Sequence, residues 1–265
     1  MKSFVIRCLA LSFLLLPLLV LSAYADSINL GTASGYSVLA GSTVTNTGTS
    51  VISGSLGVSP GCAFTGAGTM TVGGTTNLCN AASLKAQNDL TTGYLQAQSM
   101  NPTGNLTGSD LGGMTLKSGV YLFTSSADIA TGTTLTLEGT PGALFVFQIG
   151  SSLTTGSGSA VIFVNSLTGK TMTDPNIFWQ VGSSATLGTT TAFEGNILAL
   201  ASITLNTGAT ITCGSALAQT GAVTLQGNTI TGCGGGTTVP EPGTLGLLGT
   251  GLVILVGAAR RRLGL

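Results

Sequence analysis

The chain has 265 residues, of which only 6% are charged, and it contains 41 glycines and no histidine. Acid–base and metal chemistry depend mainly on His, Asp, Glu and Cys, so we expect no catalytic residue, metal or cofactor. Residues 26–239 hold three lysines, no arginine and seven carboxylates, a net charge of 3 − 7 = −4. This balance lacks the basic face that nucleic-acid binding requires.

The first 25 residues have the features of a secretory signal peptide. Lys2 and Arg7 precede an apolar run that extends to Leu21, and the Ala-Tyr-Ala sequence at 23–25 provides a small-residue cleavage site. We therefore expect residues 1–25 to be removed and the exported chain to begin at Asp26.

Short strands are expected over residues 27–60, because runs of alternating apolar and polar side chains are separated there by Gly and Asn turn residues. Residues 62–79 are rich in Gly and Thr, and we interpret them as an irregular loop that caps one end of a stack of β-coils. A stack needs such a cover because an open terminal coil would present unpaired strand edges to other chains.

A single helix is expected at about residues 80–100. Apolar residues recur there at helical spacing, either Asn80 or Ser83 can cap the start, and Pro102 stands beyond the end. We expect this helix to lie along one side of the stack and to shield that face from solvent.

The region after the helix repeats a phrase of about 20 residues, apart from a longer step across residues 165–175 that we interpret as a surface loop. Such a repeat is typical of a β-solenoid, in which each coil buries its apolar residues on the next one. Three short strands in each coil predict a triangular cross-section for residues 26–233. The coils begin at residues 120–123, 143–147, 176–179, 196–199 and 215–218.

Threonine occupies the same position in the second strand of several coils. Because stacked strands lie about 4.7–4.9 Å apart, these threonines should form a straight row of hydroxyl and methyl groups. A β-branched side chain has a constrained χ1, so the row would be stiff. A regular array of this kind favours a repeating target, and we interpret that target as ice. The residues of the predicted row are Thr154, Thr186, Thr204 and Thr224.

The turn after the second strand repeats a Thr-Gly-x-Thr pattern that adds further hydroxyl groups. Thr131, Thr189 and Thr207 are its candidate ice-binding residues, and Thr155-Gly156 matches the pattern in part. Two other interpretations stay open. Threonine columns can stabilise a solenoid without binding anything, and the same scaffold can serve a surface or biofilm adhesin.

The exported chain has four cysteines, an even number that in an exported protein indicates disulfides rather than metal ligands. Three pairings are possible. We favour the local pairs Cys62–Cys79 and Cys213–Cys233, because each would close one loop near a coil.

Carboxylates are too dispersed in the sequence to predict a polysaccharide-cleaving site. The four that follow the helix within the coils stand on different predicted strands and loops, and we expect Glu194 to form hydrogen bonds in the turn before Asn196. The four are Asp128, Glu138, Asp174 and Glu194.

Several long phrases resemble the microbial ice-binding protein family. They include residues 30–40, residues 42–48, residues 193–199 and residues 202–225, and the resemblance extends over about residues 28–233. It implies a mostly β, right-handed, discontinuous β-solenoid with one helix packed alongside, in which the first strands insert between coils built from later segments. It also implies a monomer that adsorbs to ice through a flat Thr-rich face and inhibits ice growth and recrystallisation.

The C-terminal end resembles the PEP-CTERM sorting signal of Gram-negative bacteria. After a glycine-rich linker at 234–239, residues 240–265 contain a Pro-Glu-Pro box, an uncharged stretch over 243–259 and three arginines at 260–262. The resemblance implies transient insertion in the membrane, processing by an exosortase, and delivery to the cell surface or extracellular matrix.

Overall fold

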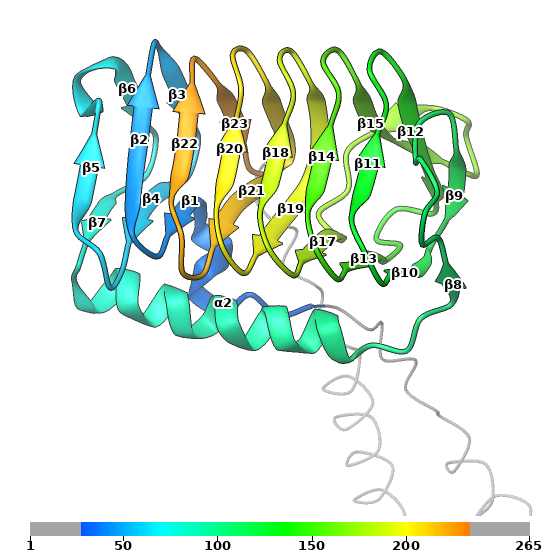
Figure 1. The fold of residues 1–265 in the computed structure, drawn as a ribbon, viewed down its shortest axis with the longest axis horizontal. Helices are drawn as coiled ribbons and strands as arrows, with labels where there is room; N and C mark the ends of the chain where they lie inside the picture. The colour runs from blue at the N-terminus through cyan, green and yellow to red at the C-terminus, as the bar shows by residue number, and fades with distance from the viewer. Residues whose placement is uncertain (1–27, 234–265) are drawn as a thin grey trace, which may run out of the picture.

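The computed structural model describes residues 28–233. Apart from one long helix, these residues form three-strand coils that stack on one another (Figure 1). The predicted signal peptide, the linker at 234–239 and the sorting segment at 240–265 lie outside the described residues. None of the helices within 28–233 has both the length and the apolar character needed to cross a membrane.

The strands form three faces, which we name the helix-side, front and rear faces. The helix-side face contains, in spatial order, β8 (Gly104–Asn105), β10 (Gly119–Phe123), β13 (Phe145–Ile149), β17 (Ile177–Val181), the second halves of β19 (Ala192–Ala199) and β21 (Thr210–Ala218), β1 (Tyr36–Ala40), β4 (Ser55–Val58) and β7 (Thr76–Leu78). The front face contains β11 (Ala127–Ile129), β14 (Leu153–Thr155), β18 (Ala185–Leu187), β20 (Ile203–Leu205), β22 (Val223–Gln226), β2 (Thr43–Thr47) and β5 (Ala63–Thr65).

The rear face completes each coil, and all its pairings but one are parallel. It contains β9 (Thr115–Lys117), β12 (Thr134–Gly139), β15 (Ala160–Asn165), the first halves of β19 and β21, β23 (Thr229–Thr231), β3 (Ser50–Ile52) and β6 (Met70–Val72). The exception is β16 (Thr171–Met172), which pairs antiparallel with β15 in the predicted surface loop.

Burial patterns explain why each face has its composition. Strands β1, β13 and β17 are buried at every residue, because the coil interior lies on one side and the helix on the other. Strands on the front face alternate, with apolar residues inward and polar residues outward. Inside the stack, Phe147 lies over Trp179 with ring centroids 3.9 Å apart, which adds an aromatic contact to the burial of apolar area.

Helix α2 (Ala81–Ser99) is capped at both ends by side-chain amides. At its start, Asn80 and Ser83 form a reciprocal capping box. At its end, Gln148 Nε2 donates to the carbonyl groups of Ala97 and Met100, both at 2.8 Å, and so supplies donors that the last turn lacks. The short 3₁₀ helices are η2 (Gly31–Gly35) and η3 (Ala67–Thr69).

The chain order of the coils is discontinuous, as the family resemblance implied. Strands β1, β2 and β3 pair with β21, β22 and β23 on one side and with β4, β5 and β6 on the other. The first strands therefore lie between the last coil of the chain and the coil that follows them in sequence, so the predicted insertion between later segments is confirmed. The reason is α2, which carries the chain back along the stack over about 28 Å (Figure 1).

The expectation of an irregular loop at 62–79 was wrong, because these residues form a terminal coil. Its strands β5, β6 and β7 continue the front, rear and helix-side faces in turn. The disulfide Cys62–Cys79 closes this coil, and Cys213–Cys233 fastens the end of the last coil, so both favoured pairings are confirmed.

Candidate functional site

The front face carries one outward threonine in each of six neighbouring coils. Parallel pairing places each threonine directly beside the next, so the row extends over about 24 Å. The residues on either side of each threonine along its strand point into the stack, and in the four predicted strands they are buried. In spatial order, the row is Thr154, Thr186, Thr204, Thr224, Thr45 and Thr65.

None of the six hydroxyl groups of this row has a hydrogen-bond partner within residues 28–233. Thr154 and Thr65 are exposed, and the other four are half-buried by their neighbours in the row. The methyl groups and hydroxyl groups are therefore both available to solvent, on backbone that is fixed by parallel pairing, on both sides for all but Thr65. The arrangement can order water or meet a lattice, but it offers no group for acid–base chemistry.

A second polar column on the front face has a different role. Ser184 Oγ accepts the backbone N–H of Ser202, and Ser202 Oγ accepts the N–H of Ala222, each at 3.2 Å. These serines thus join one coil to the next. The contrast with the threonine row shows which hydroxyl groups serve the scaffold and which are free.

The turns that follow the row strands require glycine where neighbouring coils approach closely. A Cβ atom on Gly156 would lie 2.4 Å from Thr131 N, and one on Gly188 would lie 2.5 Å from Thr155 O. Both contacts are with backbone that cannot move away. Only glycine fits at these two positions. The absence of a side chain there lets neighbouring coils stack closely just beyond Thr154 and Thr186.

The predicted turn residues lie along the edge between the front and rear faces. The backbone of Gly158 donates to Thr189 O at 2.9 Å, and Thr190 N donates to Thr207 O at 3.0 Å, so successive turns are held in register. Thr131, Thr189 and Thr207 are all exposed. Thr155, which the turn pattern placed among these hydroxyl groups, points into the stack instead and is only 2% exposed.

Two threonines of the row, Thr45 and Thr65, were missed by the sequence pattern. They come from the first strands, and Thr45 pairs with Thr224 although 179 residues separate them. The signal was present in the Thr-Val-Thr-Asn-Thr sequence of β2, but without the chain order of the coils its position in the row could not be assigned. At the other end, Asp128 takes the place of the next threonine and ends the uncharged row.

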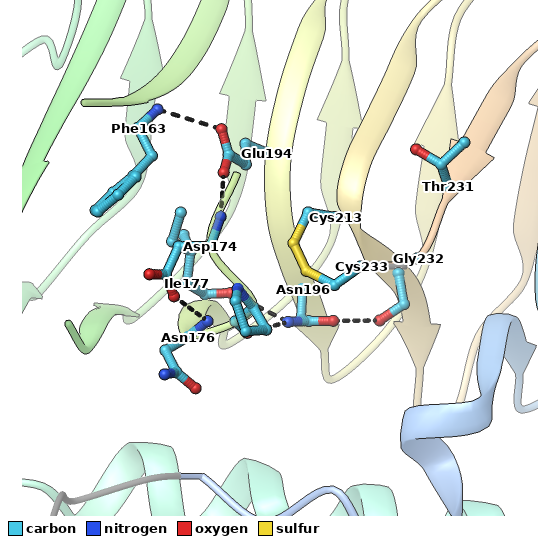
Figure 2. Close-up of a disulfide and its surroundings, with 12 residues drawn as sticks. Phe163, Asp174, Asn176, Ile177, Glu194, Asn196, Cys213, Thr231, Gly232 and Cys233 are labelled. Atoms are coloured by element: carbon cyan, nitrogen blue, oxygen red, sulfur yellow. Dashed lines mark hydrogen bonds between the residues drawn. A yellow bond between two sulfur atoms is a disulfide. The ribbon is translucent and has the colours of Figure 1, made fainter. Parts of the chain in front are cut away.

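Among the carboxylates, Asp174 and Glu194 come together, contrary to their wide separation in the sequence. Glu194 accepts the N–H of Asp174 at 2.8 Å and the N–H of Phe163 at 3.2 Å (Figure 2). The expectation that Glu194 forms hydrogen bonds in its own turn was therefore wrong. It instead fastens the surface loop across residues 165–175 onto the rear face.

Burial raises the pKa of the Glu194 carboxyl to about 7, the negative charge of Asp174 adds to this rise, and the two backbone N–H donors oppose it. Burial also raises the pKa of Asp174, whose carboxylate accepts the N–H groups of Asn176 and Gly142. Both hydrogen-bond partners of the Glu194 carboxylate are backbone N–H groups, so its role in the structure is to hold a loop. In the described part of the chain, no group of three or more His, Cys, Asp or Glu residues could hold a metal ion.

A cavity of about 680 Å³ lies where the first described residues meet the rear edge of the stack. Its walls include Asn29, Tyr36, Asn176 and Asn196 together with the Cys213–Cys233 disulfide, and no Asp, Glu, Lys or Arg lines it. The cavity therefore lacks the paired carboxylates that glycoside cleavage requires.

Comparison with known proteins agrees with this geometry. The profile of a family described as "ice-binding-like" matches residues 38–231. The chain belongs to this family. An ice-binding protein of Nostoc sp. (strain HG1) is 51% identical over 91% of this chain and 90% of its own length, and one of Flavobacterium frigoris (strain PS1) is 35% identical over 78% and 76%.

Solved structures of ice-binding proteins share the fold. The crystal structure of an ice-binding protein from an Antarctic biological consortium has a TM-score of 0.72 and 42% identity, covering 77% of this chain and 91% of that one. That of the Antarctic ascomycete Antarctomyces psychrotrophicus has a TM-score of 0.72 and 35% identity, covering 79% and 100%. A PEP-CTERM protein-sorting motif matches residues 238–262, which confirms the second resemblance and indicates export.

Proposed function

We propose that the protein adsorbs to ice through the threonine row of its front face and thereby inhibits ice growth and recrystallisation. The single observation that carries this proposal is the row itself. Six threonines stand in register on neighbouring strands, and their hydroxyl groups have no partner in the described chain. Thr131, Thr189 and Thr207 extend the surface at the turn edge.

The physical argument rests on stiffness and on the absence of charge. A threonine on a paired strand has little rotamer freedom left to lose when it meets a surface. Each hydroxyl binds water weakly, but a periodic row can position many waters together, and the methyl groups add apolar contact. Between Thr154 and Thr65 the row carries no charged side chain, so no strongly held hydration shell interrupts it.

Thr204 provides the sharpest test, since it lies inside the row. In the purified protein, Thr204→Tyr should strongly reduce the shaping of a single ice crystal held just below its melting point. The free energy of unfolding should change by no more than about 1–2 kcal/mol, as for other exposed sites. Loss of ice shaping together with retained stability would support the front face.

Thr92→Tyr is the matched control, because Thr92 is exposed on α2, away from the front face, and receives the same chemical change. It should leave ice shaping unchanged. If Thr204→Tyr shaped ice as well as the unmodified protein does, the front face would not be the ice-binding surface.

A second candidate function, a surface or biofilm-matrix adhesin, is favoured by one observation, the PEP-CTERM motif at 238–262. The motif supports processing by an exosortase and attachment at the cell surface. Binding of the protein to bacterial polysaccharide at room temperature, with no shaping of ice in the cold, would select this function. We propose that the protein acts as a monomer in either case.

A further inference from the structure

The rear face carries a second ordered group of threonines, of which the Thr-Gly-x-Thr turn pattern included only Thr210. Strand β21 contains Thr210-Ile211-Thr212, and strand β23 contains Thr229-Ile230-Thr231. The two strands are parallel neighbours, with Thr210 beside Thr229 and Thr212 beside Thr231. Ile211 and Ile230 point into the stack and are buried, so all four threonines point outward.

These four residues, which we name the rear array, form two rows rather than one. Along each strand the two threonines are about 6.6 Å apart, and across the strands about 4.8 Å. The next coil continues one of these rows with Val51, which is 43% exposed, and the coil after it with Thr71. A surface of this kind repeats in two dimensions.

The hydroxyl groups of the rear array have few commitments to the scaffold. Thr212 and Thr229 have no side-chain hydrogen bond within the described residues. Thr210 and Thr231 reach carbonyl oxygens of the neighbouring coil only at 3.5 Å, a length at which a hydrogen bond is weak. Like those of the front row, these hydroxyl groups are available to an external partner.

Charge is kept away from the rear array. Glu194 occupies the position beside Thr212 in the preceding coil, but it is only 5% exposed, because its carboxylate is turned to the N–H groups of Phe163 and Asp174 (Figure 2). The Lys117–Glu138 ion pair lies on β9 and β12, separated from β21 by β15 and β19. The loop that Glu194 holds down thus removes the one charge that would adjoin the array.

We propose that the rear array is a second ice-contact surface, formed by Thr210, Thr212, Thr229 and Thr231. This inference rests on the proposed function, since both surfaces would use stiff, uncharged threonines against frozen water. The front and rear faces meet at the turn edge, so one rigid molecule presents two threonine surfaces in different directions. Each surface then selects its own ice plane.

The test is the pattern of ice planes that the protein covers. Fluorescently labelled protein is adsorbed to a single-crystal ice hemisphere, and the planes that fluoresce are recorded. Four proteins are compared: the unmodified chain, Thr204→Tyr, the double variant Thr212→Tyr with Thr231→Tyr, and the control Thr92→Tyr. We expect two sets of planes for the unmodified chain and the control, and the loss of a different set in each of the two variants. Thr212→Lys replaces a single threonine of the rear array with a charged, soluble side chain and should act like the double variant. It keeps the test decisive if the tyrosine variants misfold.

The two proposals fail differently. If the rear variants covered the same planes as the unmodified chain, the second surface would be excluded while the front face stood. If Thr204→Tyr removed all ice binding, the rear array would again be excluded, because it would have no affinity of its own. If Thr204→Tyr changed nothing and the rear variants removed all binding, the front-face proposal would be wrong and the rear array would be the ice-binding surface.

Discussion

Thr154 and Thr155 are adjacent in the chain but belong to two opposite groups of polar side chains. Thr154 points outward in the front row and has no partner in the described chain, whereas Thr155 points inward, is 2% exposed, and lies 2.9 Å from the hydroxyl of Thr191. Strand alternation alone separates them. The same residue type therefore serves a surface in one position and the scaffold in the next.

The buried group is larger than this pair, and several of its members are hydrogen-bonded to one another. Thr191 also contacts Ser159 and donates to the carbonyl of Gly156. Where the first coil of the chain packs on the last one, Asn46, Ser50 and Asn228 form a second network. A buried polar group costs free energy unless it is paired, and an exposed one does not. Substitutions in the two groups should thus affect different properties, stability in one and ice binding in the other.

The largest effect on stability is expected at Asn228. Its Nδ2 donates to the carbonyl groups of Asn206 and Ala209 at 2.8 and 2.9 Å, and Asn228→Ala would remove both of these hydrogen bonds from part-buried and buried backbone. We expect the free energy of unfolding, measured with urea, to fall by about 3 kcal/mol. The ice affinity of the molecules that remain folded should not change.

Asn206→Ala is the matched control for this substitution. Asn206 is half-buried at the same turn, and its side chain has no hydrogen bond within residues 28–233. It should change the unfolding free energy by less than about 0.5 kcal/mol. Equal losses at the two asparagines would show that the buried network does not determine stability.

An intermediate effect is expected from an isosteric pair on one coil. Thr191→Val removes a buried hydroxyl that contacts Thr155, Ser159 and Gly156, and should lower the unfolding free energy by about 1–2 kcal/mol. Thr186→Val makes the same chemical change in the front row and should cost less than about 0.5 kcal/mol. A front-row variant as destabilised as the buried one would mean that the row is a structural ladder, contrary to the proposal.

The buried carboxylates Glu194 and Asp174 make the stability of the scaffold depend on pH. Glu194 has a folded-state pKa of about 7, above the ordinary value for a glutamate, so its contribution to stability is fully present at acidic pH and is lost as the pH rises through about 7. The raised pKa of Asp174 acts in the same direction. We expect hydrogen exchange of the Asp174 amide, after correction for the intrinsic pH dependence of amide exchange, to accelerate between pH 5 and 8, a window from about two units below this pKa to about one unit above it.

Glu194→Gln should flatten that pH dependence, because the amide does not titrate and stays neutral, like the protonated carboxyl, at every pH. Ice binding through the front row should be unchanged over the same range, since no titratable side chain lies between Thr154 and Thr65. Exchange at Asp174 that slowed at higher pH would contradict the sign of this prediction.

Sequence alone predicted the parts of the molecule that depend on local pattern. The helix, its cap at Asn80, the coil repeat, both disulfides and four of the six threonines in the front row follow from spacing within about 20 residues. Residues 62–79 were misinterpreted because their strands form the terminal coil and bury none of their residues, so the sequence there lacks the apolar alternation of the inner coils.

What the sequence could not provide was the position of one coil relative to another. Thr45 enters the row only because β2 pairs with β22, and Glu194 meets Asp174 only because the loop folds back onto the rear face. Both contacts are decided by stacking between segments that are distant in the chain. The same is true of the rear array, whose rows appear once β21 and β23 are placed side by side.

The smallest effect is expected where the front row ends. Asp128 occupies the row position beside Thr154, is exposed, and its side chain has no hydrogen bond among the described residues. Asp128→Thr should leave the unfolding free energy within about 0.5 kcal/mol and should slow ice growth slightly more than the unmodified chain does, since it lengthens the row and removes a hydrated charge. The measurement is the rate of growth of a single ice crystal at fixed supercooling and protein concentration. Asp128→Ser removes the charge but adds no methyl group, and it therefore separates the two contributions. Faster ice growth in both variants would contradict the prediction and would mean that the ice-binding surface ends before it reaches position 128.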